Sequence, residues 1–179
     1  MRTILLPVLG LAALAVGSAW AKDITGTPGD DLISGTPQAD RIMALEGHDD
    51  VQGRGGDDVI DGGPGNDELF AGNGNDTVVG GPGVDYLDGR AGDDTLTGGP
   101  GRDTFAYYAK DYDREIDNGR DTVTDFDGAG GDALLQSGFV RAEVEVRAEG
   151  GDMVVDLPGP ARITLRGVAG LDGDDLVFR

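Results

Sequence analysis

The sequence predicts an all-β protein: a solenoid of nine-residue repeats wound into a parallel coil and closed at its C-terminal end by an antiparallel β cap. Two observations predict this fold. Glycine makes up 33 of the 179 residues, and a nine-residue period runs without a gap through residues 26–106. Beyond residue 106 the period stops and short β-patterned stretches follow. The expected division is therefore 1–21, 22–106 and 107–179.

Residues 1–21 are predicted to be a cleaved signal peptide. One positive charge at Arg2 precedes an apolar run over residues 4–17, and residues 18–21 carry the small-x-small pattern that signal peptidase requires. An apolar run of about 14 residues spans roughly 21 Å as a helix, less than the ~30 Å hydrocarbon core, so a membrane span is not expected. We expect cleavage after Ala21 and secretion to the extracellular space, with the periplasm as a compartment in transit.

The second part, residues 22–106, contains nine consecutive units of nine residues over 26–106. In order, the units are GTPGDDLIS, GTPQADRIM, ALEGHDDVQ, GRGGDDVID, GGPGNDELF, AGNGNDTVV, GGPGVDYLD, GRAGDDTLT and GGPGRDTFA. Position 1 is glycine or alanine throughout, and position 4 is glycine except at Gln38. Position 6 is aspartate in every unit: Asp31, Asp40, Asp49, Asp58, Asp67, Asp76, Asp85, Asp94 and Asp103. Position 8 is apolar in every unit.

These columns favour a parallel β coil over a helix or a disordered tract. Glycine in a helix costs up to about 1 kcal/mol each relative to alanine, and a period of nine matches no helical repeat. A disordered acidic segment has no reason to keep an aspartate and an apolar residue in phase over nine units. If two units form one coil, odd units build one sheet, even units build the facing sheet, and the position-8 side chains meet between them.

Charge and composition point to a calcium ligand. The chain has 34 acidic against 14 basic residues, a formal charge of −20, and no cysteine. This charge excludes nucleic acid as a natural partner, and the absence of thiols excludes disulfides and thiolate metal sites. Stacked coils lie about 4.8 Å apart, so aspartates one coil apart would repel each other by roughly 3 kcal/mol at an effective dielectric near 20. Oxygen ligands in flexible turns suit Ca²⁺ better than Mg²⁺ or Zn²⁺.

Seven pairs of position-6 aspartates are separated by one coil, which limits the repeats to at most about seven Ca²⁺ ions. Seven divalent ions would carry a charge of +14 against the −13 of the repeats, which hold 17 acidic and 4 basic residues.

The units resemble GGxGxDxUx, the hemolysin-type calcium-binding repeat of RTX (repeats-in-toxin) proteins, and GGPGNDELF and GGPGVDYLD fit that pattern fully. The resemblance implies a right-handed parallel β-roll. It also implies that calcium binds through the nine position-6 aspartates and the turn carbonyls of neighbouring coils.

Residues 107–179 are expected to form β strands that cap the roll. Residues 119–127 alternate as a strand does, residues 139–147 and 152–157 read as a hairpin around Gly150 and Gly151, and residues 161–168 and 174–179 add further strands. In the hairpin, Val140, Ala142, Val144 and Val146 are expected to share one face. The segment also resembles the region that follows the repeats in RTX proteins. Asp121, Asp125 and Asp132 are second-rank candidates for calcium ligands there.

The sequence favours a secreted calcium-binding protein that folds on binding several Ca²⁺ ions. The alternative is an extracellular module that recognises polysaccharide or serves in adhesion through the calcium-bound roll. An enzyme is not expected, because the chain has a single histidine, His48, at a variable repeat position, and has no HExxH helix or nucleophile elbow.

Overall fold

The computed structural model describes residues 13–14, 21–111, 114–115, 118–139, 143–171 and 174–178. Residues 1–12 and 15–20 lie outside this range, so the structure does not test the predicted signal peptide. Within the described residues, no helix is long and apolar enough to cross a membrane. The structure contains a 3₁₀ turn, η1 (Gly128–Gly130).

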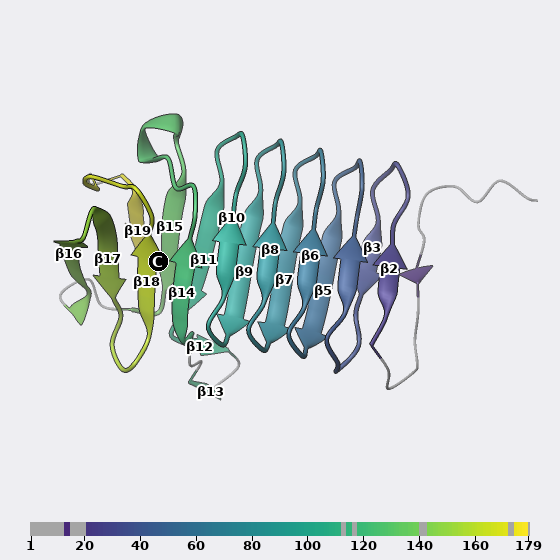
Figure 1. Cartoon of the computed structure of the whole chain (residues 1–179), viewed down its shortest axis with the longest axis horizontal. Helices are drawn as coiled ribbons and strands as arrows, with labels where there is room; N and C mark the ends of the chain where they lie inside the picture. Colours follow the sequence, from purple (N-terminus) through teal and green to yellow (C-terminus); the bar gives the residue numbers. More distant parts are fainter. Residues whose placement is uncertain are drawn as a thin grey trace, which may run out of the picture.

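Two parallel β-sheets face each other along the length of the molecule (Figure 1). In spatial order, the first sheet contains β1 (Ala13–Leu14), β3 (Leu32–Ser34), β5 (Asp50–Gly55), β7 (Glu68–Asn73), β9 (Tyr86–Ala91), β11 (Thr104–Tyr108), β15 (Ala133–Ser137) and β19 (Leu176–Phe178). The second contains β2 (Asp23–Thr25), β4 (Arg41–Met43), β6 (Val59–Asp61), β8 (Thr77–Val79), β10 (Thr95–Thr97), β14 (Arg120–Val123), β18 (Arg162–Leu165), β17 (Asp152–Asp156) and β16 (Glu145–Glu149). A short separate ladder joins β12 (Lys110–Asp111) and β13 (Arg114–Glu115).

The alternation of units between the two sheets is confirmed. Odd units supply β3, β5, β7, β9 and β11, and even units supply β4, β6, β8 and β10. Equivalent residues in neighbouring coils pair in parallel, for example Val51 with Leu69 and Ile60 with Val78. One coil of the roll is therefore 18 residues long, and two nonapeptides form it.

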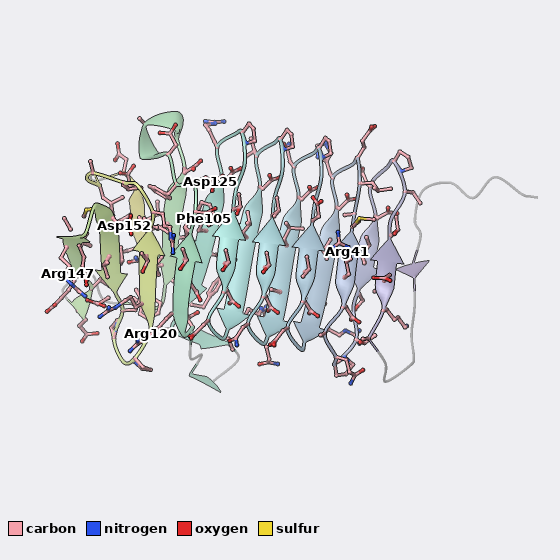
Figure 2. All side chains as sticks on the ribbon, in the orientation of Figure 1. Arg41, Phe105, Arg120, Asp125, Arg147 and Asp152 are labelled. Carbon is pink, nitrogen blue, oxygen red and sulfur yellow. The ribbon has the colours of Figure 1, made fainter. Side chains whose placement is uncertain are left out.

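The core is a single row of apolar side chains between the sheets. All nine position-8 residues are buried: Ile33, Ile42, Val51, Ile60, Leu69, Val78, Leu87, Leu96 and Phe105. Figure 2 shows Phe105 inside the roll near its C-terminal end. The row continues into Val123, Leu134 and Leu165, which are also fully buried. A core of this width buries little apolar surface per residue, so the turns must contribute to stability.

The parallel winding continues beyond residue 106, contrary to the expectation that the nonapeptide segment alone forms the roll. β14 pairs in parallel with β10, and β15 with β11. β18 then pairs with β14, and β19 with β15. The spacing between equivalent residues rises to 27 and 29 at Asp94–Asp121 and Asp103–Asp132. The sequence period disappears because these coils are longer, while the inward apolar residue of each strand is retained.

Antiparallel pairing closes the second sheet at its C-terminal edge. β16 and β17 form the predicted hairpin, with Gly150 and Gly151 in the left-handed region at its turn, and β17 pairs with β18. The first strand is shorter than expected, because β16 begins at Glu145. Val144 packs against the core but Val146 is 39% exposed, so the expected single apolar face is not formed. Val140 and Ala142 lie outside the described residues.

From the third unit on, position 4 of the repeat has no room for a side chain, because the backbone of the preceding coil lies against it. A Cβ on Gly83 would lie 1.5 Å from the carbonyl oxygen of Gly65 in the preceding coil, whereas a Cβ on Gly29, in the first coil, would meet no atom within 4 Å. Neither glycine has a positive φ. The contrast therefore isolates the stacking of coils from backbone conformation.

We predict that Gly83→Ala destabilises the folded roll by about 1–3 kcal/mol or more, because the backbone of one coil must move away from the next. Gly29→Ala should be within about 0.5 kcal/mol of the unsubstituted chain or slightly stabilising. Thermal unfolding in excess calcium measures both. Equal shifts for the two variants would contradict the stacking seen here.

Candidate functional site: two buried aspartate ladders

The position-6 aspartates form two ladders, one along each row of turns. Asp31, Asp49, Asp67, Asp85 and Asp103 precede the strands of the first sheet, and Asp40, Asp58, Asp76 and Asp94 precede those of the second. Each of these nine residues is at most 6% exposed. The structure thus brings together the nine aspartates that the sequence singled out. Their side chains are as buried as those of the apolar core.

One carboxylate oxygen of each rung is bonded to the neighbouring coil. The backbone N–H of Asp67 donates to Asp85 Oδ1 at 2.9 Å, and that of Asp58 donates to Asp76 Oδ1 at 2.7 Å. The same bond, from the earlier aspartate to the later one, joins all seven pairs of position-6 aspartates separated by one coil. The carboxylates therefore act first as acceptors that hold successive coils in register.

The other oxygen of most rungs has no partner. Eight buried Oδ2 atoms in the ladders lack a hydrogen bond: those of Asp49, Asp58, Asp67, Asp76, Asp85, Asp94, Asp103 and Asp121. Leaving a buried acceptor unsatisfied costs about 1–3 kcal/mol, and more for a charged group. A repeated deficit of this kind indicates that the turns are built for a positively charged partner.

The first two units satisfy the same oxygen with backbone. The N–H of Thr27 donates to Asp31 Oδ2, and the N–H of Thr36 donates to Asp40 Oδ2, both at 2.5 Å. Threonine at position 2 is confined to these units. In units three to nine, position 2 has a positive φ: Leu45, Arg54, Gly63, Gly72, Gly81, Arg90 and Gly99. The two turn conformations thus differ in whether the position-2 amide faces the aspartate.

In regular turns the position-2 amide is used between coils instead. Gly63 N–H donates to Gly80 O and Gly81 N–H to Gly98 O, each at 2.9 Å. The position-4 amides stack in the same way, with Gly65 N–H donating to Pro82 O at 3.0 Å. Because these amides bond from coil to coil, they do not neutralise the aspartate oxygen of their own turn.

Burial raises the pKa of the ladder carboxyls. It lifts the pKa of Asp58, Asp85 and Asp94 from 3.8 to about 7 and that of Asp67, Asp76 and Asp103 to about 6. The N–H bond from the neighbouring coil opposes this change in each case. Neighbouring carboxylates add to it at Asp58, Asp85 and Asp94. Desolvation is therefore a larger obstacle to ionisation than the repulsion between rungs that the sequence suggested.

The second-rank candidates have two different roles. Asp121 and Asp132 extend the ladders, since they accept the N–H groups of Asp94 and Asp103 at 2.9 Å. Burial, and then the charge of Asp94, raise the pKa of Asp121 to about 9. Asp125 lies outside both ladders. Both of its oxygens accept backbone N–H groups, from Gly98 and Gly99, at the end of a stack of turns (Figure 2).

The position-5 side chains also form hydrogen-bonded ladders along both rows of turns. These ladders are exposed, and the sequence analysis did not predict them. His48 Nδ1 accepts the N–H of Asn66, and Asn66 Oδ1 accepts that of Val84, both at 2.9 Å. Asp57, Asn75 and Asp93 act in the same way in the other row of turns. The column looked variable because consecutive units belong to different rows. Sorting the units by parity would have revealed the recurring short acceptors.

The donor set fits Ca²⁺ and does not fit Zn²⁺. The described residues contain no group of three or more His, Cys, Asp or Glu side chains that could hold a metal ion. An ion in the turns would therefore meet at most two carboxylates and take its other ligands from backbone oxygens or water. Calcium accepts six to eight such oxygens, whereas zinc prefers nitrogen and sulfur.

Comparison with known proteins identifies the repeat. A family profile described as "RTX calcium-binding nonapeptide repeat (4 copies)" matches residues 23–51, 43–78 and 70–105. No curated protein sequence shows a significant match to the chain.

Solved structures with a detectable likeness include the extracellular lipase LipA from Serratia marcescens, at 19% identity and a TM-score of 0.45. The alignment covers 92% of this chain and 41% of the lipase, so this chain spans about two fifths of that protein. Two subunits of the Azotobacter vinelandii mannuronan C5-epimerase also match. AlgE6R2 has 25% identity and a TM-score of 0.36, covering 87% of this chain and 91% of that subunit. AlgE6R3 has 23% identity and a TM-score of 0.36, covering 90% and 80%.

The raised pKa values predict that protons substitute for metal ions. A carboxyl with a higher pKa in the folded than in the unfolded chain stabilises the fold below its unfolded value, near pH 4, and loses this contribution as the pH rises through about 6 to 7. In EDTA, the chain should therefore retain more β structure at about pH 5 than at pH 8, as measured by circular dichroism. A β signal that is constant from pH 5 to 8 without metal would contradict the burial of these carboxyls.

Proposed function

We propose that this chain, which carries RTX calcium-binding nonapeptide repeats over residues 23–105, is a secreted calcium-binding protein whose roll becomes ordered when Ca²⁺ binds in its turns. One observation carries the proposal, namely the row of buried Oδ2 atoms that no protein group satisfies. A cation supplies the missing partner and keeps the carboxylates ionised at neutral pH.

The proposed ligands are the aspartates whose second oxygen is open. In the repeats these are Asp49, Asp58, Asp67, Asp76, Asp85, Asp94 and Asp103. Asp31 and Asp40, which the sequence placed in the same set, already accept a threonine amide on that oxygen. We therefore assign calcium to units three to nine and a calcium-independent role to the first two turns.

At the C-terminal end, Asp121 and Asp132 continue the ladders and are weaker candidates. Asp121 is followed in the next coil by Ile163, its register partner, so it has a carboxylate neighbour on one side only. Asp132 Oδ2 accepts the N–H of Asp127 at 2.9 Å. Asp125 is assigned to capping the turn stack, because both of its oxygens are occupied.

Export before folding is consistent with this proposal. Extracellular calcium is millimolar, in the range that extracellular calcium modules bind, and cytosolic calcium is far lower. Without the ion, the ladder carboxyls oppose folding at neutral pH, so the chain would stay unfolded until it leaves the cell. The predicted signal peptide supplies the route across the inner membrane.

We further propose a non-catalytic role for the chain itself. His48 is exposed, and its Nδ1 is used as a structural acceptor in the position-5 ladder. The acidic residues that line the turns are used for stacking and metal binding. Recognition of extracellular polysaccharide stays a prediction from the sequence.

Calcium should convert the processed chain from a largely disordered to a β-rich state at about 0.1–1 mM, the range of extracellular modules. Far-UV circular dichroism during a calcium titration measures the transition, and Mg²⁺ at the same concentrations is the control. Identical spectra in calcium and in EDTA at neutral pH would refute the proposed function.

Asp85→Asn should raise the calcium midpoint several-fold, because the amide oxygen keeps the bond from Asp67 N–H while the negative charge is lost. His48→Asn, which retains an acceptor for Asn66 N–H in the exposed ladder, should leave the midpoint nearly unchanged. Asp31→Asn should have a smaller effect than Asp85→Asn, since its second oxygen is already satisfied. Equal shifts in all three variants would show that the assignment of ligands is wrong.

A further inference from the structure

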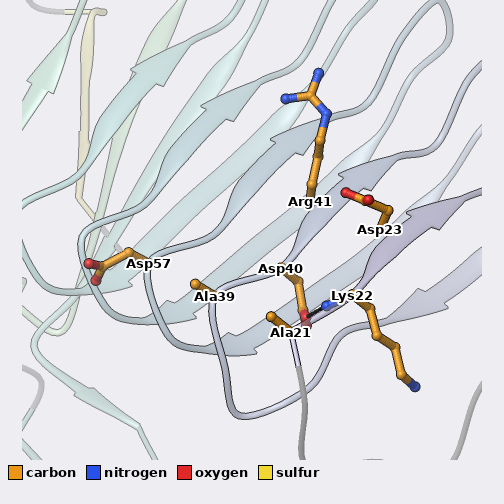
Figure 3. A pocket seen from close by; sticks show the side chains of 7 residues that line it. All are labelled: Ala21, Lys22, Asp23, Ala39, Asp40, Arg41 and Asp57. Carbon is orange, nitrogen blue, oxygen red and sulfur yellow. Dashed lines mark hydrogen bonds between the residues drawn. The ribbon is translucent and has the colours of Figure 1, made fainter.

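The first rung of the second ladder has an unusual donor. Lys22 lies 18 residues before Asp40, at the place that an aspartate fills in every later coil. Its backbone nitrogen donates to Asp40 Oδ1 at 2.6 Å, as Figure 3 shows, and its carbonyl oxygen accepts the N–H of Arg41 at 2.8 Å. The backbone of Lys22 therefore makes both hydrogen bonds that the backbone of a ladder aspartate makes, although its side chain has no carboxylate.

The same nitrogen lies at the predicted cleavage point. Hydrolysis of the Ala21–Lys22 peptide bond adds a water hydroxyl to the carbonyl carbon of Ala21 and a proton to the nitrogen of Lys22. The new α-amine has an ordinary pKa of about 7.7–8.0 and takes a second proton from solvent at neutral pH. The donor to Asp40 thereby changes from a neutral amide to an ammonium group.

We propose that leader removal creates an ion-pair site, in which the N-terminal ammonium of Lys22 binds the carboxylate of Asp40 and closes the N-terminal end of the second ladder. Asp40 is 3% exposed, and its Oδ2 is already bonded to Thr36 N–H. The ammonium therefore meets a buried carboxylate with Oδ1 facing it. The acceptor of this hydrogen bond is already charged, so the ammonium adds the Coulomb attraction between two opposite charges at hydrogen-bond distance.

The surroundings favour a cation at this place. A pocket of about 260 Å³ lies here, lined by Ala21, Lys22, Asp23, Ala39, Asp40, Arg41 and Asp57 (Figure 3). Its lining contains three carboxylates but only two cationic side chains. The new ammonium removes this excess of negative charge.

The register adds a further argument. Cleavage after Ala21 leaves no leader residue between the new terminus and the ladder, so the ammonium coincides with the donor position. A terminus three residues earlier would place the charge up to about 10 Å away, where salt screens it strongly. The inference depends on the predicted cleavage point and holds independently of which aspartates bind calcium.

The test is a comparison of termini. A chain that begins at Lys22 is compared with one that begins Gly-Gly-Ala21, each as the native sequence and with Asp40→Asn, by thermal unfolding in excess calcium. The extension should lower the melting temperature by about 2–4 °C in the native background, because the ion pair is lost while the hydrogen bond from the backbone N–H to the carboxylate stays. With Asp40→Asn the two termini should melt together. Asp31→Asn, at the first rung of the other ladder, is the matched control and should leave the effect of the extension unchanged.

Two further results complete the test. Mass spectrometry of the exported protein should find Lys22 as its first residue, and a different terminus overturns the inference without affecting the calcium proposal. In the folded chain, acetylation of the Lys22 α-amine should be several-fold slower than in the urea-unfolded chain. This readout stands even if the Asp40 variant fails to fold. An extension effect of the same size in the Asp40→Asn background, or equal acetylation rates, also overturns the inference.

Discussion

The structure depends on a buried carboxylate that is only half satisfied by the protein. In each regular turn, Oδ1 of the position-6 aspartate accepts a backbone N–H from the preceding coil, which fixes the 18-residue stacking. Oδ2 of the same group is buried without a donor. The charge that fixes the register is therefore costly to bury without a positive partner.

The conformation of the turns follows from the same constraint. Leu45, Arg54 and Arg90 adopt positive φ at position 2, which costs about 1–3 kcal/mol for residues that are not glycine. Thr27 and Thr36 occupy position 2 without positive φ, and there the amide satisfies the aspartate. The turn with positive φ thus lacks the hydrogen bond from the position-2 N–H to the aspartate and has a strained backbone. In return, the second carboxylate oxygen stays open and the amides of the turn bond to the next coil. Under the proposed function, a cation in this opening is what makes the exchange favourable at neutral pH.

The sequence was sufficient to predict the periodic part of the fold and of the site, because each column of the repeat has one physical requirement. Position 8 must be apolar to fill the core, and position 6 must carry an acceptor for the backbone N–H of the preceding coil. The sequence was insufficient where a structural feature does not correspond to one column of the repeat. The coils after residue 106 keep their inward residues, such as Val123 and Leu134, but change in length, so no period marks them. Residue type alone does not specify the orientation of the position-2 peptide. That orientation decides whether Oδ2 accepts the position-2 N–H, as in the turns of Thr27 and Thr36, or stays open.

The ladders also have a direction, and their two ends therefore need different chemistry. Each N–H donates from an earlier coil to a later carboxylate, so the first rung presents an acceptor, Asp40 Oδ1, and requires a donor from outside the aspartate series. The last rungs are complete on the acceptor side, because Asp121 and Asp132 accept the N–H groups of Asp94 and Asp103. There the second ladder meets Ile163 instead of another aspartate, and β18 and β19 supply the backbone pairing. The first end of the second ladder is thus completed by a single backbone N–H, that of Lys22, whereas the strands of the C-terminal region cover the last end.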